Sequence, residues 1–117
     1  MTKILVVDDE EHIRLLYSEE LKTEGYEVAT AASGHKFLER IEQEKPNLII
    51  LDIEMPDCNG LELLNILRSK HFDLPVVLCS AHNDYRGDVK TISAAYYVIK
   101  SFDLTELKDK IASALKK

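Results

Sequence analysis

The stretch "NLIILDIEMPDCNG", Asn47 to Gly60, places a carboxylate directly after a run of large apolar residues. The run from Leu48 to Leu51 is continuous rather than alternating, which is typical of strands covered on both faces of a parallel sheet. Asp52 follows at the carboxyl end of this predicted strand. Because a buried charge is costly unless a partner compensates it, the stretch predicts both a buried sheet and an acid with a function.

Four further apolar runs have the same character. With the first they predict five strands, over residues 3–8, 26–31, 47–52, 74–80 and 96–100. Segments with helical spacing of apolar residues lie between them, and the weakest of these is 85–95. Alternating strands and helices predict right-handed crossovers and a doubly wound parallel sheet. The predicted fold is α/β, with five strands and five helices in one domain over residues 1–117.

Local signals predict where three of the helices begin or end. Gly25 suits the C-cap of the first helix, and Ser33 suits the start of the second. The last helix opens with "DLTE", in which Asp103 can cap the helix and Glu106 stands three residues later.

Charge and cysteine content narrow the class of protein. The chain of 117 residues carries 21 acidic and 15 basic residues, a formal charge of -6, which disfavours direct nucleic-acid binding. Cys58 and Cys79 form no CxxC motif, and no run is long enough for a signal peptide or a membrane span. These features predict a soluble, reduced, cytoplasmic protein without a membrane partner.

Polar residues stand where the predicted strands end. They are Asp8 and Asp9 after the first strand, Asp52 after the third, Ser80 after the fourth and Lys100 after the fifth. In open α/β sheets, ligands bind outside these carboxyl ends, where the strand order reverses. If the order is 2-1-3-4-5, the three aspartates share one crevice. Close carboxylates repel one another, and a bound divalent cation would remove that repulsion. Mg²⁺ is the predicted cation because it prefers oxygen ligands.

Lys100 and the hydroxyl of Ser80 are suited to phosphoryl oxygens, since one offers a positive charge and the other a hydrogen-bond donor. Asp52 is suited to be the carboxylate that accepts the phosphoryl group. The residue pattern therefore predicts aspartyl phosphate chemistry.

Four motifs at these positions resemble the receiver domain of bacterial two-component response regulators, of the single-domain, chemotaxis-regulator type, and the likeness covers the whole chain. The motifs are "VVDDE" (6–10), "LDIEMPDCNGLELL" (51–64), "LCSA" (78–81) and "YYVIKSFD" (96–103). The resemblance implies a flavodoxin-like fold with order 2-1-3-4-5. It also implies a Mg²⁺-dependent signalling phosphoacceptor that assists its own phosphorylation and dephosphorylation, rather than an enzyme with a separate substrate.

The resemblance also implies a role for each site residue. Asp52 would be phosphorylated by a histidine kinase or a histidine phosphotransfer protein, with Lys100 pairing with the phosphoryl group. Ser80 would move toward that group while Tyr97 swings inward. These movements would change the surface formed by the fourth helix, the fifth strand and the fifth helix. A downstream protein or a fused output domain would recognise that surface. The implied metal ligands are the carboxylates of Asp9 and Asp52 and the carbonyl of Glu54, with Asp8 acting mainly through water.

One feature departs from the family pattern, and two further residues occupy positions to which the family gives a role. Lys100 is followed by Ser101 instead of proline, and a trans peptide is expected because a cis bond without proline costs about 2.5–4 kcal/mol. His82 and Glu54 occupy positions that the family implies to lie near the attacking water.

Two other functions compete with this interpretation. A small-molecule phosphotransferase or phosphatase could use the same aspartyl phosphate, with Glu54 as its acid, but the sequence offers no segment for a cap domain. A pseudo-receiver that only binds proteins is the second alternative, although such domains usually lack an acid or the lysine, and this chain has all of them.

Overall fold

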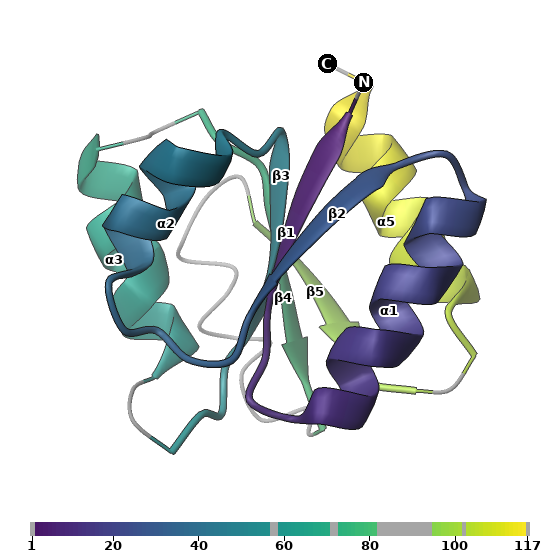
Figure 1. Cartoon of the computed structure of the whole chain (residues 1–117), viewed down its shortest axis with the longest axis horizontal. Coiled ribbons are helices and arrows are strands. Elements are labelled where there is room, and N and C mark those ends of the chain that lie inside the picture. The colour runs from purple at the N-terminus through teal and green to yellow at the C-terminus, as the bar shows by residue number, and fades with distance from the viewer. Residues whose placement is uncertain (1, 57–58, 71–72, 82–94, 102, 117) are drawn as a thin grey trace.

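The fold is a five-stranded parallel sheet between two layers of helices, as a computed structural model of the chain shows (Figure 1). The structure describes residues 2–56, 59–70, 73–81, 95–101 and 103–116. Its strands are β1 (Lys3–Val7), β2 (Glu27–Ala31), β3 (Leu48–Asp52), β4 (Val76–Ser80) and β5 (Ala95–Ile99). Neighbouring strands pair in the order β2-β1-β3-β4-β5, all in parallel, so the predicted topology is confirmed.

Four helices lie within the described ranges: α1 (Glu11–Thr23), α2 (Phe37–Glu44), α3 (Gly60–Lys70) and α5 (Thr105–Leu115). Residues 85–94 of the predicted helix over 85–95 fall outside the described residues, as do Cys58 and His82, and its last residue, Ala95, belongs to β5. None of the helices in the described ranges combines the length and apolar character that crossing a bilayer requires.

Each face of the sheet carries its own hydrophobic core. Helices α2 and α3 cover one face, and α1 and α5 cover the other (Figure 1). Every residue of β3 and β4 is buried, which explains why their sequences are continuous apolar runs. Since β3 and β4 are each paired with a neighbouring strand on both sides, the residues that follow them start from a rigid part of the sheet.

The end of α1 agrees with the sequence, and the start of α2 does not. Gly25 has a φ of 97° and its N–H donates to the carbonyl of Lys22 at 3.0 Å, which is the glycine termination that was predicted. The prediction that Ser33 begins the second helix is wrong, because α2 begins at Phe37. The Ser33 hydroxyl instead accepts the N–H of His35 at 3.1 Å, a local turn that competes with a helix start.

The predicted capping box of the last helix is also wrong in detail. Leu104 occupies the N-cap position of α5 and makes no side-chain cap. Asp103, one residue earlier, accepts both the N–H and the hydroxyl of Thr105, at 3.0 and 2.7 Å. The aspartate therefore stabilises the turn into the helix rather than capping it.

Candidate functional site

The predicted site residues gather at the carboxyl ends of the strands, and the pleat divides them between two faces. Asp8, Asp52 and Lys100 each come two residues after a member of the core under α1 and α5. Ser80 instead comes two residues after Leu78, which belongs to the core under α2 and α3, as does Tyr97. Because side chains alternate along a strand, the acids and Lys100 share one face, and Ser80 and Tyr97 belong to the other.

Lys100 is the centre of the charged group. Its Nζ lies 3.0 Å from Asp8 Oδ2, 3.2 Å from Asp52 Oδ2 and 2.9 Å from Glu10 Oε1. Its side chain is only 12% exposed, and those of Asp8 and Asp52 are 3% and 1% exposed. Although desolvation opposes its charge, hydrogen bonds to Glu10 and Asp8 and the nearby Asp52 raise the pKa of Lys100, so it remains a cation.

The two carboxylate oxygens of Asp52 have different surroundings. Its Oδ1 accepts the N–H of Glu54 at 3.2 Å. Its Oδ2 is buried and accepts no hydrogen bond from the described residues, although Lys100 lies nearby. Burial and the negative charge of Asp8 raise the pKa of Asp52 to about 7, against the opposing effect of Lys100. A buried oxygen of this kind is suited to bind a cation or to act as a nucleophile.

This raised pKa predicts how stability depends on pH. Between pH 4 and 7 an unfolded Asp52 ionises while the folded residue keeps its proton, so the metal-free protein should lose stability as pH rises. Asp52→Asn should remove that loss and be more stable than the wild type at pH 8 by about 2 kcal/mol. Urea unfolding in EDTA at pH 5, 6.5 and 8 measures this, and equal pH slopes for the two proteins would contradict it.

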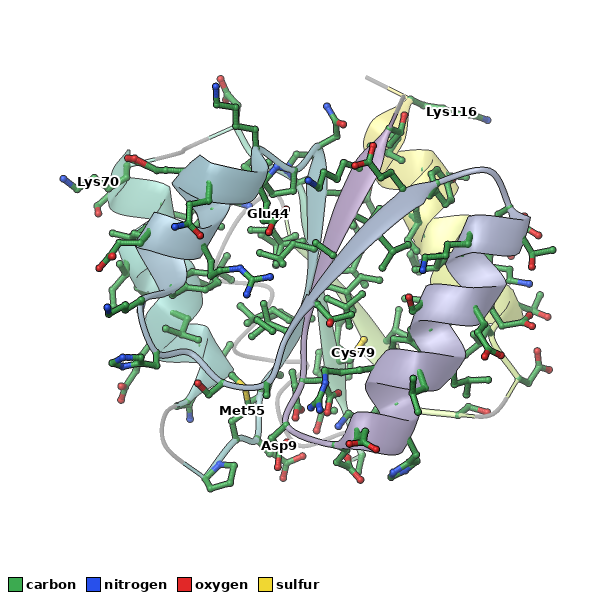
Figure 2. The ribbon with its side chains drawn as sticks, viewed as in Figure 1. Asp9, Glu44, Met55, Lys70, Cys79 and Lys116 are labelled. Atoms are coloured by element: carbon green, nitrogen blue, oxygen red, sulfur yellow. The ribbon has the colours of Figure 1, made fainter. Side chains whose placement is uncertain are left out.

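The acids next to the site offer ligands for a divalent cation. One ligand atom each from Asp8, Asp9 and Glu10 lies within 4.8 Å of the others. With the available oxygen of Asp52, these residues present hard oxygen donors, which fits Mg²⁺. Glu10 was not among the predicted site residues, although its place directly after the two aspartates was a signal for it. Figure 2 shows Asp9 and Met55 at the same end of the molecule, opposite Lys116.

Ser80 lies beside this group but contacts a different acid. Its side chain is fully buried, and its Oγ donates a hydrogen bond to Glu54 Oε1 at 2.8 Å. Tyr97 is 7% exposed and packs in the core under α2 and α3. The described residues contain no cis peptide bond, so the Lys100–Ser101 peptide is trans, as predicted.

Gly60 begins α3 at a point where only a residue without a side chain fits against the end of β3. A Cβ atom at this position would overlap the carbonyl oxygen of Asp52 and lie 2.8 Å from Ile53 Cα. Its N–H donates to the Ile53 carbonyl at 2.8 Å. The first turn of α3 therefore packs against the backbone of Asp52 and fixes its position.

Cys79 lies next to Asp52 in the sheet and is fully buried. Burial raises the pKa of its thiol to about 12, so the sulfur stays protonated. Tyr17 of α1 is its hydrogen-bond partner and is also buried. Together they form part of the buried core next to Asp52, and the thiol is not a reactive group.

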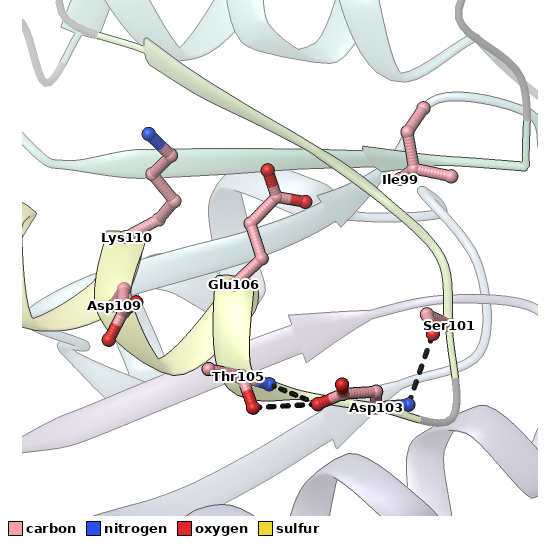
Figure 3. A pocket seen from close by; sticks show the side chains of 7 residues that line it. All are labelled: Ile99, Ser101, Asp103, Thr105, Glu106, Asp109 and Lys110. Carbon is pink, nitrogen blue, oxygen red and sulfur yellow. Dashed lines mark hydrogen bonds between the residues drawn. The ribbon is translucent and has the colours of Figure 1, made fainter.

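Two cavities flank the end of β5. One of about 320 Å³ is lined by Glu10, Ile13, Ala81, Lys100 and Ser101, and so gives access to the lysine from solvent. Another, of about 500 Å³, lies between β5 and the start of α5, with Ile99 and Glu106 among its walls (Figure 3). There Ser101 Oγ accepts the N–H of Asp103 at 3.0 Å. Only the first cavity opens onto the charged group.

Comparison with known proteins identifies the family. A family model described as "Response regulator receiver domain" matches residues 4–112. The probable transcriptional regulator ycf27 of Cyanophora paradoxa is 39% identical over 117 residues, which are 98% of this chain and 48% of that protein. The sporulation initiation phosphotransferase F of Bacillus subtilis is 32% identical over 97% of this chain and 93% of that protein. The chain spans about half the length of the first relatives that it matches.

Solved structures agree with these sequences. The response regulator TrrA of Thermotoga maritima in complex with Mg²⁺-BeF superposes with a TM-score of 0.91 and is 45% identical, covering 98% of this chain and 100% of that one. TrrA in complex with the histidine kinase ThkA gives a TM-score of 0.89 at 45% identity, over 99% and 100% of the two chains. Because the family model and these relatives extend along nearly the whole sequence, the chain belongs to the response regulator receiver domains.

Proposed function

We propose that this receiver domain accepts a phosphoryl group on Asp52 and works as a phosphorylation switch in a two-component system. The observation that supports this most directly is the buried Oδ2 of Asp52, which accepts no hydrogen bond from the described residues and lies 3.2 Å from Lys100 Nζ. A nucleophilic oxygen beside a fixed cation is what in-line phosphoryl transfer requires.

In the proposed reaction, Asp52 Oδ2 attacks the phosphorus of a phosphohistidine. The P–N bond breaks, and its electron pair leaves with the imidazole. Lys100, already held within the site, balances the negative charge that spreads over the phosphoryl oxygens. Mg²⁺ would be held by Asp9, Asp52 and the carbonyl of Glu54, with Asp8 acting through water, and would supply further positive charge to the phosphoryl oxygens.

The proposed switch uses the other face of the sheet. Ser80 would turn toward the phosphoryl group, and Tyr97, which is already buried beside the α2 and α3 core, would be favoured in its inward position. The switch would shift the balance between two conformations without a change of fold.

The proposed donor is a histidine kinase or histidine phosphotransfer protein, which the ThkA complex of the similar TrrA supports. Regulators such as ycf27 are about twice as long as this chain, so the downstream target could be a separate protein or an output domain fused to this one. We assign residues 1–117 to one receiver domain and place it in the cytoplasm, as a phosphoacceptor that assists its own phosphorylation.

Intact mass spectrometry after incubation with Mg²⁺ and acetyl phosphate tests the proposal. The wild type should gain one phosphoryl group, while Asp52→Asn and the wild type in EDTA should gain none. Asp73→Asn is a matched control, since it changes an exposed aspartate, and it should label like the wild type. Equal labelling of Asp52→Asn, or no labelling of the wild type, would reject the proposal.

A further inference from the structure

Glu54 connects the phosphoacceptor to the serine of the proposed switch through two different groups. Its backbone N–H donates to Asp52 Oδ1 at 3.2 Å, and its side-chain Oε1 accepts the hydrogen bond of Ser80 Oγ at 2.8 Å. The serine hydroxyl is fully buried, whereas the glutamate side chain is exposed. One residue therefore contacts both groups that phosphorylation would have to rearrange.

The main chain around Glu54 is anchored although its side chain is exposed. The N–H of Ile53 donates to the Cys79 carbonyl at 3.0 Å, which extends the β3–β4 pairing beyond Asp52. Glu54 itself forms an antiparallel bridge with Asn59. Because these contacts fix the backbone of Glu54, they also fix the position from which its side chain extends to Ser80.

The hydrogen bond between these side chains competes with the proposed switch. A serine hydroxyl has one proton and can donate it to one acceptor at a time. An ionised carboxylate is a strong, charge-assisted acceptor, and a phosphoryl oxygen is another. While the proton points at Glu54, it cannot stabilise a phosphoryl group on Asp52.

We propose that Glu54 is a positioning residue that holds Ser80 in its resting orientation, so that its carboxylate opposes the phosphorylated conformation. This inference rests on the proposed function, because it concerns how that switch is restrained. It requires only the side chain of Glu54, since the backbone carbonyl assigned to Mg²⁺ is retained in any substitution.

Binding of beryllofluoride with Mg²⁺, followed by isothermal titration calorimetry, tests the restraint without phosphoryl turnover. Glu54→Ala should bind about tenfold more tightly than the wild type, because a hydrogen bond to a charged acceptor no longer has to be broken. Glu54→Gln keeps a neutral acceptor and should fall between the two. Glu62→Ala, the same change at an exposed position of α3, should bind within twofold of the wild type.

A double-mutant cycle separates this restraint from a plain charge effect. In a Ser80→Ala background, Glu54→Ala should change the affinity by less than about twofold, because the hydroxyl that it restrains is gone. The metal-free proteins provide a second measurement, since the two substitutions should be non-additive in urea unfolding if the hydrogen bond forms. Both are measurable even if one variant is less stable than the wild type.

The outcomes distinguish the two proposals. If the wild type binds Mg²⁺-beryllofluoride no better than Asp52→Asn, the proposed function is wrong. If the wild type binds through Asp52 but Glu54→Ala has the same effect with and without the Ser80 hydroxyl, the function stands and the restraint is rejected. An affinity for Glu54→Ala equal to or weaker than that of the wild type rejects the restraint as well.

Discussion

Replacing Lys100 with methionine is expected to lower the free energy of unfolding by about 3 kcal/mol at pH 8 in the absence of Mg²⁺. Methionine keeps most of the side-chain volume but removes the cation that lies within 3.2 Å of Asp8 and Asp52. The two buried carboxylates would then face each other without compensation. At pH 5.5 the loss should be smaller, because Asp52 can take up a proton there.

Urea unfolding of wild type and Lys100→Met at both pH values measures this effect. Lys108→Met is the matched control, because Lys108 pairs with Glu20 and Glu24 on the surface, with its own side chain 30% exposed. That substitution should cost less than about 1 kcal/mol. If the two variants lose equal stability at pH 8, the buried carboxylates do not depend on the charge of Lys100.

Gly60→Ala is expected to destabilise the protein by about 2–3 kcal/mol and to weaken Mg²⁺ binding at the same time. The added Cβ would overlap the carbonyl oxygen of Asp52, which is backbone at the end of the buried central strand and cannot move away cheaply. Relief requires α3 or the end of β3 to shift, and a shift of β3 displaces the Asp52 carboxylate.

Urea unfolding, together with calorimetric titration of Mg²⁺, checks both parts of this prediction. Asn65→Ala, on the exposed side of the same helix, should change the stability by less than about 0.5 kcal/mol and leave Mg²⁺ binding unchanged. A Gly60→Ala protein with wild-type stability and Mg²⁺ affinity would show that the first turn of α3 does not fix the position of Asp52.

The sequence predicted the strands correctly, because their positions depend on a local pattern of apolar residues. Strand positions agree with the structure to within two residues at each end, because a strand buried on both faces must be apolar throughout. Predictions failed at helix starts, where Ser33 forms its own turn and Leu104 rather than Asp103 occupies the N-cap. Side chains that favour caps also favour turns, so one residue type fits two local structures.

The sequence by itself determined five apolar runs that form strands, and it placed an acid, a serine or a lysine at the end of four of them. Because a parallel sheet brings the carboxyl ends of its strands to one edge, these residues were expected to form one site. Only the tertiary structure decided which of them touch. Lys100 contacts Glu10 across 90 positions of chain, and Ser80 bonds to Glu54 rather than to Asp52. Such pairings depend on sheet register, on the alternation of side chains between two faces and on the space that Gly60 leaves, all of which arise when distant segments pack together.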